Sequence, residues 1–519
     1  MPVTSRARTL TLVATILGSA IVFIDSTVVN VALPALSRDL GATLAEQQWV
    51  VESYLLMLGS LVLVGGSLGD LLGRRRVFMA GVAGFGVTSL LCALAPSAIV
   101  LIAARALQGV AGALLVPSSL AIVTATFDGP ARAQAIGTWT AGTSAAIAVG
   151  PPLGGLLVDH ASWRWVFALN VPFVIAALML AVRVMPRMPG DRLRNADVLG
   201  GVFCALGLAG PVWALIEQPR HGWGAPVVWA PLAGGLALLA LFVRHERRAS
   251  DPMLPGPLFA SRAFNVTNLV TLAVYAGLGS ATFFVAIFLQ QVGGYSALEG
   301  GLSLMPITFF LLLLSSRWGG LAGRIGPRPL MSAGPFVAAL GLLLFLRVDE
   351  HAGYIAQLLP AAAVFGLGLS MTVAPLTATA LAAAPAELAG IASGANNAIA
   401  RIAGLLAIAV VGAVVAASFG SGLDRRLAGV ALDAPARRAL ASARARPLAL
   451  VGVPRSSAVA ELVDRAQIRA SVDAFHRGML VSALLVAAGG LLALLLLPRG
   501  LIEAERSADR LAADPPALT

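Results

Sequence analysis

The chain has 519 residues, of which 58% are hydrophobic and 12% are charged, and its formal net charge is +11. Soluble domains carry about 25% charged residues, so this composition and a mean hydropathy of +0.87 exclude an ordinary soluble enzyme. The positive charge lies in arginines between apolar runs rather than on one face, which argues against nucleic acid as a partner. The sequence therefore predicts an all-α polytopic membrane protein in contact with a lipid bilayer.

Apolar runs long enough to cross a bilayer, which takes about 20 mainly apolar residues in a helix, occur fourteen times. We place these spans at 10–33, 48–69, 77–95, 98–123, 134–158, 165–185, 197–216, 226–243, 265–289, 299–320, 329–346, 354–375, 390–418 and 478–497. The segment 420–475 is rich in Ala, Arg and Pro and is expected to be partly helical. Cys92 and Cys204 lie apart without metal or redox spacing, so we expect them to pack.

Polar residues interrupt the first span. Asp25 lies inside it, and a carboxylate within a membrane helix is costly and commonly functional. Thr15, Ser19, Ser26 and Asn30 recur at helical spacing, so they form a polar stripe with Asp25 at its border. This side of the first helix is therefore expected to face water, protons or solute.

Arginines in the short connections predict the orientation, because cytoplasmic connections are enriched in them. With the N-terminus inside, the short outer connections hold only Arg38, Arg164, Arg220 and Arg347. The inner ones hold Arg6, Arg8, Arg74, Arg75, Arg76, Arg132, Arg183, Arg187, Arg192, Arg194, Arg244, Arg247, Arg248, Arg262, Arg324, Arg328 and Arg499. Both termini are therefore expected in the cytoplasm and 420–475 outside, since long loops are largely exempt from this rule.

A weak internal repeat relates GSLGDLLGRRR at 66–76 to GGLAGRIGPRP at 319–329, which match at four positions. Both segments follow outside-to-inside spans, the second and the tenth. Many secondary transporters consist of two such repeats, and six helices per half would leave two inserted helices between them. The predicted domains are a six-helix half at 1–195, the inserted pair at 196–248, a second half at 249–498 and a cytoplasmic tail at 499–519.

Five short motifs occur in a fixed order. They are DSTVVNVALP at 25–34, GSLGDLLGRRR at 66–76, RALQG at 105–109, GPPLGG at 150–155, and WRWVF at 163–167 with Asn170 and Pro172 after it. Together they resemble the motifs of the major facilitator superfamily, specifically its fourteen-span drug:proton antiporter branch. The resemblance covers essentially the whole chain, and it implies the major facilitator fold and the proton-coupled export of small compounds.

The motif after the second span is a candidate cytoplasmic gate. Gly66 and Gly73 permit close helix approach and a tight turn, and Asp70 meets the arginine run that begins with Arg74 and Arg75. Such a charge cluster can lock the cytoplasmic side in one state and release it in another. A purely positive-inside anchor is the alternative, but it leaves the acid unexplained.

Three ionisable residues are candidates for proton coupling: Asp25 first, Glu52 second, and Arg105 as a modulator. Arg105 lies a few residues into the fourth span, so we expect it to contact carboxylates or backbone carbonyls of the first and second helices. Snorkelling to the helix end is the alternative. Glu52 lies about one turn inside the second span, where it either takes part in coupling or simply reaches external water.

Small residues recur every four positions in the fifth span: Gly142, Ala146, Gly150 and Gly154. This ridge permits tight packing against another helix, and Pro151 and Pro152 are expected to bend the span. By resemblance, Gly150, Pro151, Gly154 and Gly155 belong to the antiporter motif, which implies that they help to seal and hinge the transport path.

Polar residues within spans are the candidates for substrate binding: Asn30, Tyr54, Gln108 and Asn396. Asn397 and Arg401 follow in the thirteenth span, whereas the acid Glu387 lies outside it. Because no GxxxxGK[ST] motif is present, we expect the proton motive force to drive transport, with no cofactor, no metal and no enzymatic reaction.

The predicted function is a monomeric plasma-membrane antiporter that exports small amphiphilic compounds, drugs or antibiotics, by alternating access. A dedicated exporter of one endogenous metabolite or self-made antibiotic would share every motif. A membrane enzyme or receptor on the same scaffold would need a catalytic cluster or a soluble domain, and the sequence indicates neither.

Overall fold

The protein is described here from a computed structural model, which covers residues 5–186, 188–190, 197–385 and 388–498. Fourteen helices in these residues are long and apolar enough to cross a membrane, and each overlaps one predicted span. The prediction of an all-α, fourteen-span membrane protein is therefore confirmed. Arg187, Arg192, Arg194, Glu387 and the tail 499–519 lie outside the described residues.

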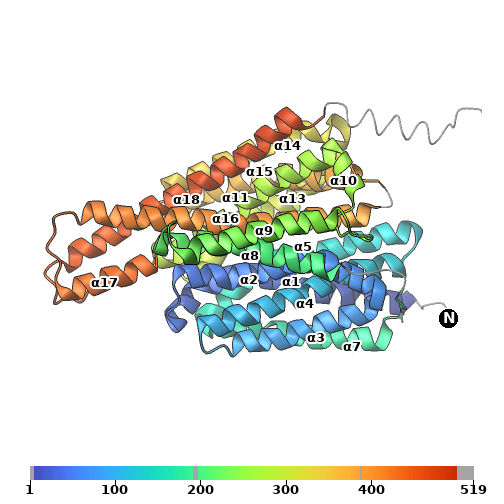
Figure 1. Cartoon of the computed structure of the whole chain (residues 1–519), viewed down its shortest axis with the longest axis horizontal. Coiled ribbons are helices and arrows are strands. Elements are labelled where there is room, and N and C mark those ends of the chain that lie inside the picture. The colour runs from blue at the N-terminus through green and yellow to red at the C-terminus, as the bar shows by residue number, and fades with distance from the viewer. Residues whose placement is uncertain (1–4, 187, 191–196, 386–387, 499–519) are drawn as a thin grey trace, which may run out of the picture.

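The first six spans form one bundle, drawn from blue to teal in Figure 1, which we call the N-half. Its helices are α1 (Ser5–Leu40), α2 (Leu44–Leu72), α3 (Arg74–Ala93), α4 (Ala98–Thr126), α5 (Gly129–His160), α6 (Arg164–Ala168) and α7 (Asn170–Val184). The short α6 and α7 together make the sixth span. The end of the bundle where α1 ends and α2 begins is called the distal end, and the opposite one the proximal end.

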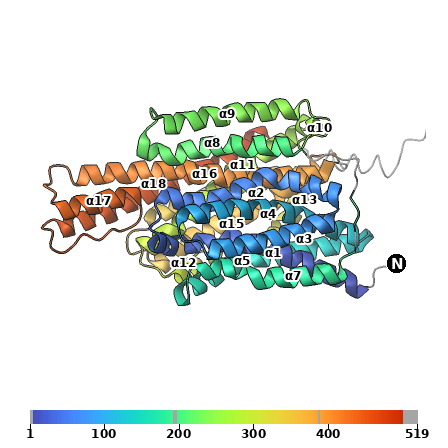
Figure 2. The same cartoon turned by 60° about the horizontal axis from the view of Figure 1, so that its bottom comes forward.

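Two further spans, α8 (Val198–His221) and α9 (Pro226–Glu246), form a hairpin at the side of the molecule (Figure 2). Gly210 lets these helices approach closely, because a Cβ there would lie 2.2 Å from the carbonyl oxygen of Pro231. Apolar residues of α8 pack against both α2 and α16, in a cluster that includes Val212, Leu56 and Leu405. The hairpin therefore covers a seam between the first and last thirds of the chain.

The remaining spans form a second bundle, which we call the C-half. Its helices are α10 (Gly256–Ala260), α11 (Arg262–Gln291), α12 (Ala297–Ser303), α13 (Met305–Ile325), α14 (Pro327–Leu344), α15 (Leu359–Ala382), α16 (Ala389–Arg426), α17 (Ala434–Ala445) and α18 (Ala460–Leu496). A 3-10 turn (Phe345–Arg347) and a π-helical turn (Tyr354–Leu358) precede α15.

The repeat seen in the sequence extends to the backbone of the second and tenth spans. Each begins with a capping box, in which a Thr43–Glu46 or Ser296–Glu299 pair satisfies the first backbone N–H groups. Each ends at a glycine with positive φ, 98° at Gly73 and 95° at Gly326. Only glycine adopts this conformation readily, so the two spans have matching start and stop signals.

Several helices are longer than the hydropathy predicts. The helix α1 continues through Pro34 to Leu40, because the surrounding helices bury this end and offset the one missing hydrogen-bond donor. The helix α18 begins at Ala460 rather than near 478. Its additional turns are polar on one side, and the other side is buried at Ala466, Ala470 and Ala474.

These extensions make 420–475 largely helical, which confirms the prediction of a partly helical segment. The ends of α16 and α18, with α17 beside them, project beyond the distal end of the bundle (Figures 1 and 2). Arg426 donates to Asp473 at 2.6 Å across the two long helices. Gln467 exchanges two hydrogen bonds of 3.0 Å with the backbone of Val451, so the projecting lobe has its own fixed structure.

Candidate functional site

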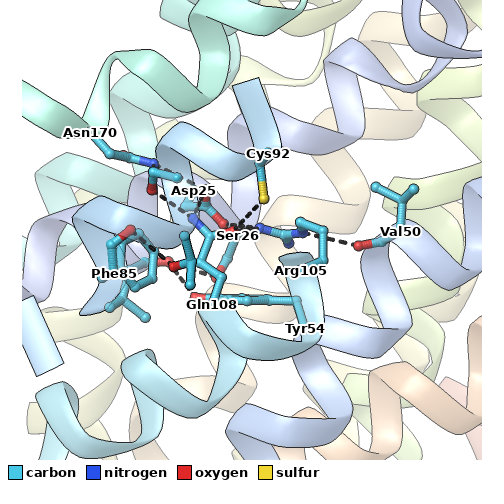
Figure 3. Close-up of polar contacts among 12 residues, drawn as sticks. Asp25, Ser26, Val50, Tyr54, Phe85, Cys92, Arg105, Gln108 and Asn170 are labelled. Carbon is cyan, nitrogen blue, oxygen red and sulfur yellow. Dashed lines mark hydrogen bonds and ion pairs between the residues drawn. The ribbon is translucent and has the colours of Figure 1, made fainter. Parts of the chain in front are cut away.

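A completely buried ion pair lies in the middle of the N-half. Asp25 of α1 accepts a charged hydrogen bond at Oδ2 from Nη1 of Arg105 in α4 (Figure 3). Its other oxygen, Oδ1, accepts hydrogen bonds from the side-chain amides of Gln108 and Asn170, each at 3.1 Å. Three donors therefore surround the carboxylate, which is the environment that an ionised acid needs in a low-dielectric interior.

Arg105 also connects α4 to α2. Its Nε donates to the carbonyl oxygen of Val50 at 3.0 Å, and its guanidinium carbon lies 4.1 Å from the ring centroid of Tyr54. This distance is within the range of a cation–π interaction. Since Arg105 is completely buried, it does not snorkel to the helix end; it contacts a carboxylate of the first helix and a carbonyl of the second.

A second layer of hydrogen bonds fixes the donors around Asp25. Ser89 of α3 accepts from Gln108 at 2.9 Å and from Asn170 at 3.2 Å. The amide oxygen of Gln108 accepts from Arg105 at 2.7 Å and from the thiol of Cys92 at 3.6 Å. The network thus includes side chains from α1, α3, α4 and α7 and a backbone carbonyl of α2.

Local features of the sequence explain why these side chains meet at Asp25. Arg105 and Gln108 are three residues apart, so they leave α4 on one face. Gly109 follows, and a Cβ there would lie 2.5 Å from the carbonyl oxygen of Tyr54, so only glycine permits this close approach of α4 to α2. The sixth span is also interrupted at Leu169, between α6 and α7, and this places Asn170 at the start of a helix.

A cavity of about 530 Å³ lies between the two halves. Its walls come from α1, α2 and α5 on one side and from α11, α12, α13, α15 and α16 on the other. Most of its lining is apolar, with a few hydroxyl and amide groups, as in ordinary small-molecule sites. Its position between two bundles is the position expected for a transported solute.

Asp25 lies directly behind the wall of this cavity. Its neighbours Ser26 and Thr27 line the cavity, and so does Asn30 one turn further along α1. Asp25 itself points the other way, into the N-half. The predicted polar stripe therefore divides: Ser19 hydrogen-bonds to a serine of α4, and the stripe reaches the cavity only from Ser26 onward.

The fold and the buried charge network point to a membrane transporter, and comparison with known families gives the assignment. The family model of the Major Facilitator Superfamily matches residues 15–408. The chain belongs to this superfamily. Together with the fourteen spans, this makes it a multi-pass membrane transporter rather than an enzyme.

Three similar proteins are named for resistance or export. The chain is 35% identical over 493 residues to the multidrug resistance protein Stp of Mycobacterium tuberculosis H37Rv, covering 93% of this chain and 90% of that protein. It is 36% identical over 414 residues to the tetracenomycin C resistance and export protein of Streptomyces glaucescens, covering 79% and 76%. The cephamycin export protein CmcT of Amycolatopsis lactamdurans is 37% identical over 416 residues, covering 79% and 85%. These relatives agree with the drug-efflux branch that the motifs indicate.

Among solved structures, the fold is similar to an inward-facing, unoccupied bacterial homolog of the human lysosomal transporter Spinster. The TM-score is 0.68 and the alignment covers 95% of this chain and 98% of that one, at 16% sequence identity. This likeness shows the fold alone.

The superfamily motif after α2 joins helices of the N-half at the proximal end. Arg74 contacts Oδ1 of Asp70 through Nε at 3.1 Å and Nη2 at 3.0 Å. It also donates to the carbonyl oxygen of Ala121 at 3.2 Å, and Arg75 donates to that of Val182 at 2.9 Å. The motif therefore attaches the end of α2 to the ends of α4 and α7, while Gly66 lies beside α4, near Pro117.

The GPPLGG segment of α5, at 150–155, lies between α1 and the C-half. A Cβ at Gly150 would lie 2.0 Å from Oγ1 of Thr27, and one at Gly154 would lie 2.3 Å from a methyl carbon of Val28, so these glycines pack tightly on α1. Gly155 faces the other way, where a Cβ would lie 2.4 Å from the Cα of Leu298 in α12. Pro151, which is inside α5, lines the cavity.

Further contacts between the halves lie at or near the distal end. Asp159 of α5 accepts hydrogen bonds from the first two backbone N–H groups of α12, at 3.0 and 2.8 Å. Gln290 donates to the carbonyl oxygen of Val31 at 3.0 Å, and Gln48 donates to that of Ile408 at 2.8 Å. Among the described residues, these are the hydrogen bonds that join α1–α7 to α11–α18, so the halves are held together on the distal side of the cavity.

Of the four residues predicted to bind substrate, Asn30 and Asn396 line the cavity. The structure places Tyr54 and Gln108 elsewhere: both are completely buried in the network around Arg105. Their helices present them to the interior of the N-half, which the spacing of polar residues alone does not reveal. Sequence reasoning gave no role to Asn170, although it follows the fifth motif and is polar within a span.

Glu52 is completely buried, so it does not reach external water in this structure. The reason is that α2 begins at Leu44, which places Glu52 two turns rather than one turn inside the helix. Neither carboxylate oxygen has a hydrogen-bond partner among the described residues. Gln48 and Leu56, one turn to either side, both contact α16, so Glu52 faces the seam between the halves.

Proposed function

We propose that the protein is a proton-driven antiporter that exports small amphiphilic compounds across the plasma membrane by alternating access. The observation that carries this proposal is the position of Asp25, which is buried in an ion pair directly behind the wall of the central cavity. One helix, α1, thus bears both the candidate proton site and part of the candidate substrate site.

The charge state of Asp25 decides how strongly α1 is attached to α4 and α7. When Asp25 is ionised, it holds Arg105, Gln108 and Asn170 in place. Protonation removes the ion pair and frees the guanidinium, which also contacts the backbone of α2. Because a proton and a substrate each favour one arrangement of the same helices, their binding becomes linked.

In the orientation that the arginines predict, the distal end faces outward and both termini face the cytoplasm. The contacts of Asp159, Gln290 and Gln48 would then close the cavity from outside, and the structure would be the state that receives substrate from the cytoplasm. Separation of the halves at this end would release the substrate outside. We propose that one chain suffices, because the cavity is formed within it.

The names of the relatives support export of drugs or antibiotics. Stp is described as a multidrug resistance protein, whereas others at similar identity are named for one compound, such as tetracenomycin C or cephamycin. This second group favours one alternative, a dedicated exporter of a single metabolite or self-made antibiotic. A broad or a narrow set of transported compounds separates the two functions.

Transport into everted membrane vesicles tests the proposal. Vesicles that contain the protein should concentrate members of a compound panel when a proton gradient with an acidic vesicle interior is imposed. They should lose this ability when the gradient is collapsed. Vesicles without the protein are the control. Accumulation that persists without the gradient would exclude proton coupling, and accumulation of one compound alone would favour the dedicated exporter.

A further inference from the structure

We propose that the cavity selects amphiphiles that carry an anionic group, such as a carboxylate or a sulfonate, and that Arg401 of α16 binds this group. The inference specifies the substrate class of the proposed exporter and rests on that function.

The charges around the cavity carry this proposal. Arg401 is the one charged residue among the described residues that line the cavity. Asp25 is neutralised by Arg105 behind the wall, and Glu52 is buried in the seam and is not part of the lining. The lining therefore has a positive charge that no acid of the lining balances.

The hydrogen bonding of Arg401 leaves its terminal nitrogens available. Nε donates to Oδ1 of Asn397, one turn earlier in α16, at 3.1 Å. The guanidinium carbon lies 6.0 Å from the ring centroid of Phe23, across the cavity on α1. In the described part of the chain, Arg401 forms no ion pair, and this one hydrogen bond does not use Nη1 or Nη2. The planar guanidinium can thus present two parallel donors, which match a carboxylate or sulfonate.

The depth of Arg401 makes an unpaired charge costly. It lies twelve residues after the start of α16 at Ala389, which corresponds to about 18 Å along the helix. An ionisable residue at such depth in a membrane protein usually pairs with another group or serves a solute pathway. Since the described residues provide no acid for Arg401, a substrate anion is the partner that would compensate it.

The other lining residues fit the remainder of such a ligand. Phe23, Leu55, Leu278 and Leu311 provide apolar surface for a hydrophobic body. Asn30 also lines the cavity, and its side-chain oxygen is buried without a hydrogen-bond partner, so it can accept from a hydroxyl or amide of the ligand. A volume of about 530 Å³ is in the range of sites for drug-sized molecules.

A pair of probes with one skeleton tests the charge preference: 8-anilinonaphthalene-1-sulfonate, an anion, and N-phenyl-1-naphthylamine, which lacks the sulfonate. Equilibrium binding of both tritiated compounds is measured with the purified full chain in detergent, with empty micelles subtracted. The variants are Arg401→Gln and Arg401→Lys, and Arg347→Gln, an exposed arginine outside the cavity, is the matched control.

We expect Arg401→Gln to weaken binding of the anion about tenfold or more, because a charge-assisted hydrogen-bond pair is lost, and to change binding of the neutral probe less than about twofold. Arg401→Lys keeps the charge without the planar donor pair, so its affinity for the anion should lie between those of the unsubstituted protein and Arg401→Gln. If Arg401→Gln does not fold, the lysine variant provides the test. Equal effects on both probes, or no effect on the anion, would overturn the inference.

Binding at equilibrium needs no proton gradient, so this result is independent of coupling. Gradient-driven transport of both probes in proteoliposomes is measured in parallel. If that transport occurs but Arg401 does not discriminate between the probes, only the inference about substrate charge fails. If the gradient drives transport of neither probe although both bind, the proposed function fails and the binding preference stands.

Discussion

Asp25 and Ser26 are consecutive residues of α1 that face different environments: Asp25 pairs with an arginine inside the N-half, and Ser26 lines the central cavity. Successive residues of a helix are rotated by about 100°, so a single helix can separate a charge from a solute and still connect them mechanically. A rotation or tilt of α1 would change both environments together.

Coupling predicts a specific defect for Asp25→Asn. The amide has nearly the same shape and imitates a permanently protonated acid, so the variant should bind substrate but fail to concentrate it with a proton gradient. Equilibrium binding to purified protein and gradient-driven uptake into everted vesicles measure the two properties. Asp39→Asn is the matched control, since Asp39 also pairs with an arginine, Arg164, but at the distal surface. Full proton-coupled transport by Asp25→Asn would remove Asp25 from the mechanism and leave Glu52 as the candidate.

Glu52→Gln should reduce gradient-driven transport less than Asp25→Asn does. Its carboxylate has no hydrogen-bond partner in the described chain, so the neutral amide breaks no ion pair. We expect transport to fall less than in Asp25→Asn, and the thermal unfolding midpoint to stay or rise. Asp25→Asn should lower that midpoint, because an unpaired Arg105 costs about 3–5 kcal/mol. A lower midpoint in Glu52→Gln than in Asp25→Asn would show that Glu52 has a stabilising partner.

The sequence was sufficient to predict the spans and the partners of Arg105, because hydropathy and the cost of burying a charge are local properties. It also indicated that α5 packs tightly, from the spacing of Gly150 and Gly154. The polar ends of α16 and α18 could not be predicted in this way, since their stability comes from contacts with each other and with α17, as in the Arg426–Asp473 pair.

Sequence alone did not show which polar residues meet the cavity. Tyr54, Gln108 and Asn30 are all polar residues within spans, yet only Asn30 lines it. The rotation of each helix is set by its packing against other helices, which involves residues far apart in the sequence, such as Gly109 and Tyr54 within the N-half or Gln48 and Ile408 between the halves. The depth of Glu52 within α2 was also underestimated, because the polar residues in the first turns of α2 keep hydropathy from detecting where the helix begins.

We expect Asp70→Asn to slow transport, because we propose that the charge cluster of Asp70 and Arg74 acts as a cytoplasmic gate. The charged contact with Arg74 would weaken, while the hydrogen bond from Arg74 to Ala121 remains, so the protein should insert and fold normally. Initial rates of transport across the compound panel, normalised to the amount of protein in the membrane, measure the effect. Asp128→Asn is the control, because Asp128 pairs with Arg132 at an exposed site outside the motif. Wild-type rates in Asp70→Asn for every compound would exclude the charge lock.

Orientation is tested with single cysteines in a background without Cys92 and Cys204. Ser421 lies in the distal extension of α16, and Ser250 lies in the connection after α9; both are exposed. In intact cells, an impermeant thiol reagent should label a cysteine at 421 and should reach one at 250 only after the membrane is opened. The reverse pattern would place the termini outside and would invert the direction of the proposed transport.

The GPPLGG segment of α5 provides the last prediction, through Gly155. A methyl group there would collide with the backbone of Leu298, so Gly155→Ala forces the halves apart at the distal end. Overpacking of this kind costs about 1–3 kcal/mol, which is enough to move a two-state equilibrium about fivefold or more toward the distally open state. We therefore expect slower transport and greater access to the cavity from the distal side.

Access is measured with a cysteine in place of Thr282, which lines the cavity, in the same cysteine-free background. An impermeant reagent applied from the distal side should label it faster in Gly155→Ala than in the parent. Gly137→Ala is the matched control, because Gly137 lies in the same helix and, in the described part of the chain, a Cβ there would have no atom within 4 Å beyond its own stretch of helix. If both alanine variants label and transport like the parent, the contact between α5 and α12 does not limit opening, and the seal must depend on other contacts such as those of Asp159 and Gln290.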